Sequence, residues 1–561
     1  MKKNKVAIIG IDGGTFDIID PLLKKGDLPN IASIMKNGCR SELTTTIPPI
    51  TLPAWVSLAT GVNPAKHGIY YFSSDTHKTY DEGPLVNTTN IKAKPLWQIL
   101  TENDKKCIAV TIPFTYPPMK VDGAMVSFPV RTGQIDKFRS YPPEIMDELK
   151  RELDLEQQKI ESLRHILNTS AKGDASSRVV SLHKKAVEMI TDATLYLMDK
   201  VDWSFLMTVF QSSDVMQHCF WAHMDKDHPY YKAANHEKYG NVIFDTYRKI
   251  DAAIGRIIKK AGKDTTFIIM SDHGAAPVHK YFFTNKWLMK KGWLVLNGKR
   301  PYKVDIKSRP LEKVLARIGM KGFIRFLPYH VRTAKIPSPN KRFLPLSELI
   351  DWSKTKAYAT NTGININLKG REPNGIVEQG EYDRTSNNIR EELYKLLDPQ
   401  TGEKVIDKVF RRDEIYHGPY LEDAYDLYFT PERSLYLPTK SLNSRDIIEP
   451  LPDKEMSMTA HHFNCMKGIF MTQGPNISRK CRPDSPEIID ILPTVLYLMG
   501  IKIPDNVDGR VLEEVVNEDY LRDNLIGFSS AKAYEGHEAT PILKQDEDEI
   551  RRQLRNLGYI E

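Results

Sequence analysis

The sequence predicts an α/β fold built around a mostly parallel β-sheet. Three continuous apolar runs, rich in β-branched or aromatic residues, have the length of buried strands: 6–11, 202–210 and 265–270. A stretch with helical spacing follows each of the first two runs, as in the units from which parallel sheets are built. Each run also leads to an aspartate: Asp12, Asp214 or Asp272. Ligands bind at the carboxyl ends of the strands in such sheets, so we expect these carboxylates at one edge.

The expected elements alternate along the chain. After the first strand come Gly13 and Gly14, and then a helix over Ile18–Met35. The spacing of these glycines fits neither the dinucleotide-binding fingerprint nor the GxxxxGK[ST] phosphate loop. Further helices are expected over 95–102, 141–168, 176–200, 239–261 and 486–499, and further strands over 107–112 and 468–472.

The stretch from Thr44 to Tyr71 contains a candidate nucleophile, Thr51. Ala54–Thr60 predicts a short helix, with a proline suited to its first turn and a glycine suited to its end. A hydroxyl at this place lies near the N-terminus of a helix, where backbone N–H groups attract phosphate-like anions. The alternative is that Thr51 only caps the helix or opens a turn.

The character of the chain changes twice, which predicts a core with insertions. We expect the first part of a catalytic core at 1–285, with a helical insertion at about 118–175. Residues 286–454 are turn-rich and predict a cap or insertion lobe. The core resumes at 455–515, and a tail at 516–561 ends with a charged helix over 546–557.

Composition excludes several classes of protein. A chain of 561 residues can bury a large core and form more than one lobe. The net charge of +7 is small for this length, and lysine and arginine are spread along the chain, so no nucleic-acid polymer is expected as a partner. The five cysteines are far apart without a CxxC pair, which argues against a disulfide framework or a structural zinc site.

The N-terminal sequence MKKNKVAIIGIDGG predicts a cytoplasmic protein. Its apolar run, 6–11, is too short for the core of a signal peptide. No stretch approaches the length of a transmembrane span, so no membrane association is expected. The oligomeric state is left open.

Histidines accompany the aspartates and predict a metal site. His218 follows Asp214 by four residues, and His273 follows Asp272 directly. The pair His461-His462 precedes the expected strand at 468–472. Aspartate and histidine together are typical ligands for zinc or a similar divalent ion. Together with Thr51, these residues are numerous enough to hold two ions.

The ordered motifs resemble a known family. They are GIDGGTFDIIDPLL, PPITLPAWVSLATGVNPAKHGI, DVMQH, IIMSDHG and IIDILPTVLYLMGIKIPDNVDGR. Nearly end to end, the chain resembles the alkaline phosphatase superfamily in its type I phosphodiesterase/nucleotide pyrophosphatase branch. Through INLKGREPNGIV and YHGPYLEDAYDL it resembles the predicted cytoplasmic phosphohydrolase/phosphomutase group more closely. The resemblance implies an alkaline phosphatase-like α/β/α sandwich with an inserted cap lobe.

The resemblance also implies a set of metal ligands. One ion would be held by Asp12, Asp272 and His273 with the hydroxyl of Thr51, and the second by Asp214, His218 and one histidine of the His461-His462 pair. His461 is the choice made here, because the small residues before it resemble the family's approach to its last histidine. The following strand begins later than in the family, so the choice between the two histidines stays open.

The implied activity is hydrolysis of a phosphoric ester, either a diester or a monoester. Thr51 would form a phospho-threonine intermediate at two divalent ions, zinc first and manganese as the alternative. The partner would be a small phosphorylated substrate, whose binding residues are unknown. A phosphomutase using the same phospho-enzyme is the first alternative, and a non-catalytic binding protein is the second. Trp55 could stack on a base or belong to the core, and Arg371 could bind phosphate or serve packing.

Overall fold

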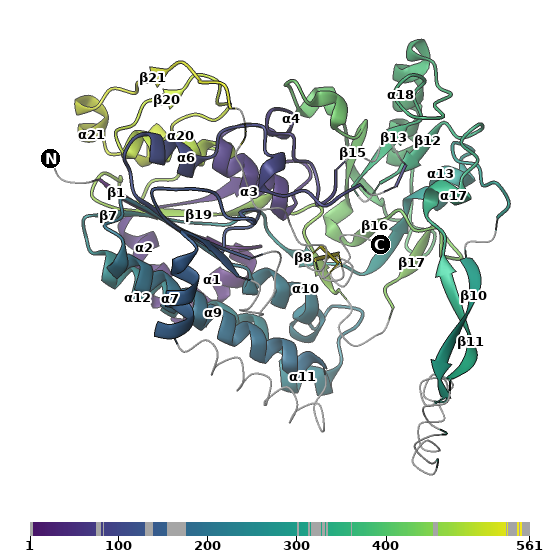
Figure 1. Cartoon of the computed structure of the whole chain (residues 1–561), viewed down its shortest axis with the longest axis horizontal. Coiled ribbons are helices and arrows are strands. Elements are labelled where there is room, and N and C mark those ends of the chain that lie inside the picture. The colour runs from purple at the N-terminus through teal and green to yellow at the C-terminus, as the bar shows by residue number, and fades with distance from the viewer. Residues whose placement is uncertain are drawn as a thin grey trace.

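An eight-stranded β-sheet forms the centre of the molecule in the computed structural model (Figure 1). The structure describes residues 4–74, 80–81, 83–128, 138–153, 175–299, 302–311, 315, 327, 331, 335–360, 362–452, 458–534, 536, 547–548 and 550–551. The strand order is β2-β19-β7-β1-β6-β3-β4-β5. Five adjacent strands run parallel: β7 (Thr265–Met270), β1 (Lys5–Ile11), β6 (Phe205–Phe210), β3 (Cys107–Val110) and β4 (Gly123–Ser127).

Antiparallel pairings extend this parallel centre on both sides. β19 (Lys467–Gln473) pairs antiparallel with β7 and with β2 (Cys39–Thr44). On the other side, β5 (Arg139–Tyr141) pairs antiparallel with β4. The sheet is therefore mostly parallel, as the sequence predicts.

Side chains of β1 serve two separate cores, one on each face of the sheet. Val6 and Ile8 belong to the core on one face, whereas Ala7, Ile9 and Ile11 belong to the core on the other. Successive side chains of a strand point to opposite faces, so a strand covered on both sides reads as a continuous apolar run. This explains why the apolar run at 6–11 predicted a buried strand correctly.

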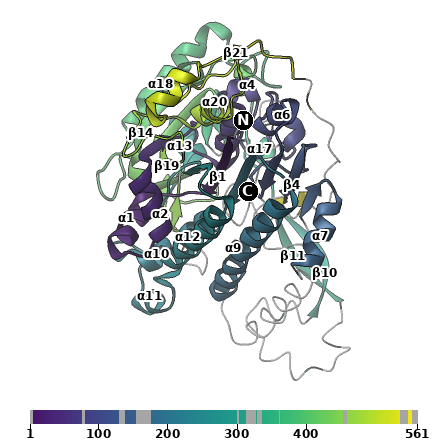
Figure 2. The ribbon, with the colours of Figure 1, turned by 90° about the vertical axis from the view of Figure 1, so that its left-hand side faces the viewer.

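Helices cover both faces of the sheet (Figures 1 and 2). The helices that contribute to the first core are α3 (Thr51–Thr60), α6 (Leu96–Glu102) and α20 (Ile491–Leu498). Those that contribute to the second are α1 (Phe16–Lys25), α2 (Pro29–Asn37), α7 (Glu144–Glu152), α9 (Ala175–Lys200), α10 (Ser212–Met224), α11 (Ala233–Tyr239) and α12 (Val242–Ala261). The α/β/α class predicted from the sequence is confirmed.

One of the expected helices is wrong because it is divided. The helix expected at Ile18–Met35 is α1 followed by α2. Gly26 ends α1 with a φ of 77°, in the left-handed region that glycine adopts readily, and Pro29 begins α2. The helix expected at 239–261 is confirmed as α12, which begins at Val242 and ends at Ala261.

Smaller sheets lie beside the main one. An antiparallel sheet combines β12 (Ala357–Ala359), β13 (Gly363–Ile366), β15 (Leu427–Pro431) and β14 (Ile406–Arg411), and α18 (Tyr382–Tyr394) shares its core. Another contains β16 (Tyr436–Thr439), β9 (Lys280–Phe283) and β17 (Ile448–Pro450). The two-stranded sheets are β10 (Tyr302–Pro310) with β11 (Lys335–Phe343), β18 (Ala460–His461) with β8 (Ala276–Pro277), and β20 (Ile503–Pro504) with β21 (Phe528–Ser529). The remaining α-helices are α4 (Pro64–His67), α13 (Thr284–Lys290), α17 (Leu346–Leu349), α19 (Arg412–Ile415) and α21 (Glu518–Asp523).

The division of the chain into core, cap and tail stays a prediction. β4 and β5, which belong to the central sheet, lie within the segment expected to be a helical insertion. The part of that segment from 154 to 174 lies outside the described residues, as does most of the helix expected at 546–557. None of the described helices has the length and apolar character needed to cross a bilayer.

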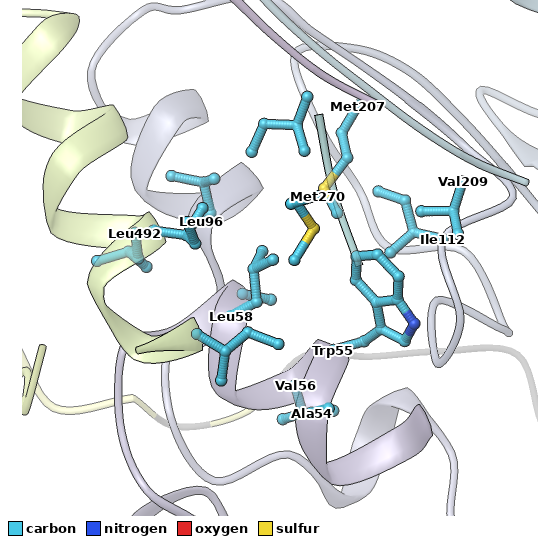
Figure 3. Close-up of a cluster of buried hydrophobic side chains, with 14 of the residues drawn as sticks. Ala54, Trp55, Val56, Leu58, Leu96, Ile112, Met207, Val209, Met270 and Leu492 are labelled. Atoms are coloured by element: carbon cyan, nitrogen blue, oxygen red, sulfur yellow. The ribbon is translucent and has the colours of Figure 1, made fainter. Parts of the chain in front are cut away.

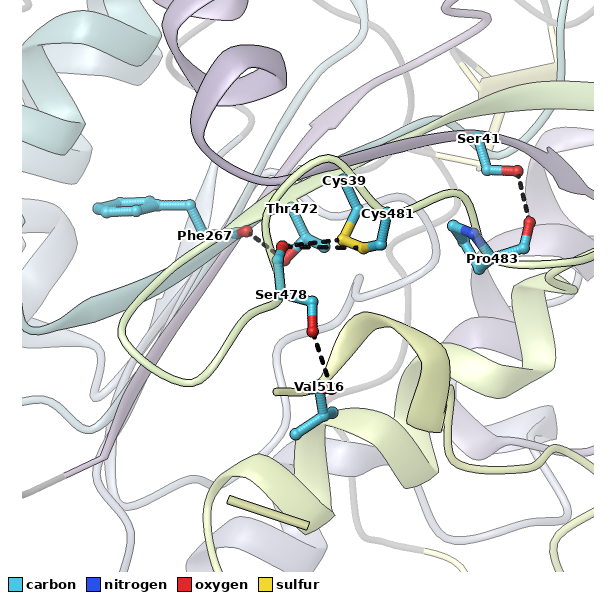
Figure 4. The surroundings of a disulfide bond; sticks show 8 residues. All are labelled: Cys39, Ser41, Phe267, Thr472, Ser478, Cys481, Pro483 and Val516. Carbon is cyan, nitrogen blue, oxygen red and sulfur yellow. Dashed lines mark hydrogen bonds between the residues drawn. A yellow bond between two sulfur atoms is a disulfide. The ribbon is translucent and has the colours of Figure 1, made fainter. Parts of the chain in front are cut away.

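A disulfide bond joins Cys39 to Cys481, so the expectation drawn from cysteine spacing is wrong for this pair (Figure 4). Cys39 begins β2, and Cys481 follows β19, which pairs with β2. The two residues are separated by 442 positions in the sequence, but their Cα atoms are 4.6 Å apart. Cysteine spacing could not reveal this pair because the contact arises from strand pairing.

Candidate metal centre

The three predicted aspartates lie together at the carboxyl ends of three adjacent strands. Asp12 directly follows β1, Asp272 follows β7, and Asp214 lies in the first turn of α10 after β6. The Asp12 backbone N–H donates to the Phe210 carbonyl at 3.1 Å, which holds the ends of β1 and β6 together. All three aspartates are at most 1% exposed.

The aspartates and histidines form three overlapping groups of possible ligand atoms. These are Asp12, Asp272 and His273; Asp214, His273 and His462; and His218, His461 and His462. Within each group the ligand atoms all lie within 4.8 Å of one another. His273 and His462 each belong to two groups, so the three groups form one continuous cluster.

Thr51 lies beside this cluster. Its Oγ1 is 3.3 Å from Nε2 of His273, and the residue is 2% exposed. The helix α3 begins at Thr51, earlier than the expected start at Ala54, and Ile50 occupies the cap position without a side-chain cap bond. The alternative in which Thr51 caps the helix is therefore wrong. Gly61 ends the helix in the left-handed conformation, as expected.

Local geometry places the aspartate ligands. Asp214 and His218 are four residues apart in α10, so both side chains lie on the same face of the helix, with His218 Nε2 3.3 Å from Asp214 Oδ2. The Gly13 backbone N–H donates to Asp272 Oδ1 at 3.1 Å. Gly13 has a φ of +64°, and a Cβ on it would lie 2.9 Å from Asp214 Oδ1. Glycine is thus required both by the backbone and by the neighbouring carboxylate.

Hydrogen bonds fix the tautomer of three histidines. The Nδ1 atoms of these rings donate to backbone carbonyls: His218 to Ala460 at 2.6 Å, His273 to Gly274 at 2.9 Å, and His462 to Pro49. A carbonyl oxygen can only accept, so Nδ1 carries the proton and the neutral ring keeps a lone pair on Nε2. Metal-binding histidines typically show this arrangement.

His461 has the opposite arrangement. Its Nδ1 accepts a hydrogen bond from the backbone N–H of His462 at 2.8 Å, so the neutral ring carries its proton on Nε2. Its ring stacks on Phe463 with the centroids 4.3 Å apart. Burial, reinforced by the nearby His273, holds the pKa of His462 well below its usual range, which keeps that ring neutral.

The donor set fits divalent cations. Carboxylate oxygens and imidazole nitrogens are the ligands that zinc and manganese share. Burying three aspartates beside one another is costly unless cations neutralise them. The residues present can therefore hold one or two such ions.

Trp55 and Arg371, the two further candidates, do not contribute to this cluster. Trp55 is 1% exposed and packs in the core beside Met207, Val209 and Ile112 (Figure 3). Arg371 makes a two-pronged contact with Asp426, with Nη1 2.7 Å from Oδ1. Both side chains thus have the packing roles that were the alternative interpretations.

Sequence reasoning missed the residues that support the ligands. Ser213 Oγ donates to the Asp12 carbonyl at 2.6 Å, and Ser271 Oγ donates to the Gly14 carbonyl at 3.0 Å. Gln217 Nε2 donates to the Gly13 carbonyl at 2.9 Å. These three side chains hold the loop after β1. A sequence signal exists for two of them, because a serine directly precedes the aspartate in both Ser-Asp motifs.

An α/β/α sandwich with an aspartate–histidine cluster and a buried hydroxyl at its strand ends has the fold and site of a metal-dependent hydrolase. The chain belongs to the type I phosphodiesterase/nucleotide pyrophosphatase family, whose model matches residues 6–463. It is therefore a hydrolase that acts on phosphoric esters. A comparison with curated protein sequences gave no match.

Solved structures with a similar course of the chain include human ectonucleotide pyrophosphatase/phosphodiesterase 5. The identity is 14% and the TM-score 0.48, over 92% of this chain and 100% of that one. The murine protein of the same name, as an inactive variant in complex with AMP, gives 13% identity and a TM-score of 0.49 over the same shares of the two chains.

Proposed function

We propose that this hydrolase acts through a phospho-threonine intermediate formed on Thr51. The observation that carries the proposal is the position of Thr51 Oγ1, 3.3 Å from His273 Nε2 within the aspartate–histidine cluster. A threonine hydroxyl is a weak nucleophile at neutral pH and needs such surroundings to react. A buried hydroxyl at the start of a helix and beside metal-binding side chains meets this need.

Two sets of residues would hold two divalent ions. Asp12, Asp272 and His273, with Thr51, would hold one, and Asp214, His218 and His462 would hold the other. Bound divalent ions lower the pKa of a coordinated hydroxyl and neutralise charge on a phosphoryl group. Zinc is the first expectation and manganese the second, because both suit these donors.

We infer that His462, in place of His461, is the last ligand. His462 presents its Nε2 lone pair and belongs to two of the three ligand groups. His461 accepts a backbone hydrogen bond on Nδ1, which leaves the proton on Nε2. A ligand nitrogen must be free of its proton, so the hydrogen bonds favour His462.

The start of α3 would bind the transferring phosphoryl group. Backbone N–H groups at a helix N-terminus bind anions. Pro53 has no N–H, so the donors in the first turn are limited to Thr51 and Leu52. The helix would thus orient the phosphoryl group directly above the attacking hydroxyl.

Replacement of the nucleophile tests this mechanism. Thr51→Ala should lower turnover of phosphoric esters by at least about 10³-fold, because the variant lacks the attacking hydroxyl. The assay is a panel of mono- and diester substrates with zinc, manganese and magnesium.

The matched control is Thr246→Ala in α12, where a buried threonine hydroxyl donates to the Val242 carbonyl at 2.8 Å. That variant should keep turnover within a few-fold of wild type. Turnover that survives Thr51→Ala, or that needs no metal, contradicts the proposal.

A phosphomutase is the second candidate, favoured by the cap motifs INLKGREPNGIV and YHGPYLEDAYDL. It would use the same phospho-threonine but return the phosphoryl group to another oxygen of one substrate. Release of inorganic phosphate into water supports the hydrolase, whereas an isomer that retains its phosphate supports the mutase.

The cytoplasmic location also stays a prediction. The Cys39–Cys481 disulfide bond argues for an oxidising compartment, because disulfides are rare in proteins of the reducing cytosol. Alkylation of free thiols in protein taken directly from cells, followed by mass spectrometry, distinguishes the two.

A further inference from the structure

A cleft of about 740 Å³ lies apart from the metal centre. Its wall includes Thr60, the last residue of α3, whereas Thr51 is the first residue of that helix. The two ends of this helix are about 14 Å apart along its axis. None of the proposed metal ligands lines the cleft. Its volume is in the usual range for small-molecule sites.

The wall of the cleft is strongly basic. Five lysines from four parts of the chain line it: Lys66, Lys92, Lys94, Lys502 and Lys532. Glu102 is the one acidic residue among the described residues that line it. Glu102 pairs with Lys94 at 2.7 Å, and Asp508 pairs with Lys66 from outside the lining.

Three of these lysines have no compensating acid among the described residues. Within the described part of the chain, no carboxylate lies within ion-pair distance of Lys92, Lys502 or Lys532. Several like charges around one cleft repel one another and raise the local concentration of anions. The paired lysines are also partly shielded, with side chains 28% exposed for Lys66 and 18% for Lys94. The cleft therefore favours a ligand with more than one negative charge.

Two tyrosines give the cleft an aromatic component. Tyr420 comes from the loop before the short helical turn at 421–423, and Tyr534 from the segment after β21. Burial raises the pKa of Tyr534 to about 12, so its phenol is neutral at physiological pH. The Tyr534 hydroxyl already interacts with Gln98, so the tyrosines offer a ligand their ring faces.

We propose that this cleft binds a phosphorylated small molecule with an aromatic ring, of the class of nucleoside diphosphates, at a site separate from the metal centre. The lysines would bind the phosphates, and the tyrosines would contact the ring. The ligand would touch the end of α3 opposite Thr51, so it would act as an effector rather than as the substrate. This proposal does not depend on the phospho-threonine mechanism.

Protection of lysines from an amine-reactive reagent tests the proposal. The full-length, metal-loaded protein is labelled with and without ADP, over a time in which chromatography of the nucleotide shows that ADP stays intact, and is then analysed by mass spectrometry. ADP at saturation should slow labelling of Lys92, Lys502 and Lys532 by at least about fivefold. The control lysines, exposed on helices of the other face of the sheet, should change by less than about twofold: Lys24, Lys36 and Lys259.

Pyrophosphate, adenosine and sulfate at matched ionic strength complete the design. Pyrophosphate should protect more weakly than ADP, and adenosine and sulfate should not protect. Protection of the cleft lysines no greater than that of the control lysines overturns the proposal. Equal protection by adenosine removes its electrostatic basis, and equal protection by pyrophosphate removes the role of the ring.

Reversal of one lysine's charge gives a second, independent test of the proposed site. Lys502 is exposed, so Lys502→Glu should not disturb the fold. The variant should raise the ADP concentration that half-protects Lys92 and Lys532 by about tenfold. Lys259→Glu makes the same change of charge on α12 and should leave protection unchanged. Equal effects of the two variants contradict a specific site.

Discussion

At the scale of single residues, two adjacent histidines make different hydrogen bonds. His461 and His462 are both at most 1% exposed, and both lie among the possible metal ligands. Their hydrogen bonds differ, since Nδ1 of His462 donates to a carbonyl and Nδ1 of His461 accepts from an amide. In our proposal, this difference in proton position makes His462 a metal ligand and His461 a supporting residue.

Metal content distinguishes the two residues experimentally. His462→Asn should lower the bound zinc or manganese by about one ion per chain and weaken turnover by 10-fold or more, as loss of a ligand does. His461→Asn is the control, because it changes the same chemistry one residue away and should keep the metal content. Elemental analysis of the purified proteins measures both, and greater loss of metal from His461→Asn contradicts the choice of His462.

At the scale of elements, α3 and α4 are joined by a buried polar pair. Ser57 Oγ in α3 lies 2.9 Å from His67 Nε2 in α4, and His67 is 0% exposed. Burial lowers the pKa of His67 to about 3, partly opposed by the charge of Asp508. The neutral His67 ring thus stabilises the contact between α4 and α3, the helix that begins at Thr51.

This pair predicts a pH dependence of stability. The folded pKa of His67 is below its ordinary value of 6.5, so the unfolded chain binds the proton more readily. The contribution of His67 is fully present above pH 6.5 and falls by about 1.4 kcal/mol per pH unit below it, towards pH 3. Denaturant unfolding between pH 7.5 and 4.5 measures this, with His67→Asn as the comparison. The variant should lose less stability than wild type over this range, and parallel losses contradict the assignment.

At the scale of the whole molecule, the Cys39–Cys481 bond ties an edge strand to a distant segment. The strand β2 is at the edge of the eight-stranded sheet and is followed by the approach to Thr51. The bond closes a loop of 442 residues, so it restricts the unfolded chain more than the folded one. The bond therefore stabilises the pairing of the edge strand β2 with β19.

Removal of the disulfide bond should destabilise the protein. The double variant Cys39→Ser, Cys481→Ser should lose about 2–5 kcal/mol of unfolding free energy. Denaturant unfolding compares it with wild type under oxidising conditions. Under a strong reductant, the two proteins should become equally stable, and equal stability before reduction contradicts a structural bond.

The sequence determined the parallel centre of the sheet and the set of candidate ligands. Strands buried on both faces leave continuous apolar runs, and the aspartates at the ends of β1, β6 and β7 stand in the sequence where those runs stop. The division into core, cap and tail was also predicted from the sequence and stays a prediction. The motifs likewise indicated the family, which the match over 6–463 confirms.

Only the tertiary structure decided how distant residues meet. Four features depend on neighbours far away in the chain or on backbone conformation. They are the Cys39–Cys481 pair, the packing of Trp55, the break between α1 and α2, and the hydrogen bonds of the two adjacent histidines. The basic cleft is another case, because its lysines are scattered from Lys66 to Lys532. Local patterns record which side chains are buried and where strands end, whereas hydrogen-bond direction and charge clustering arise only when the chain is folded.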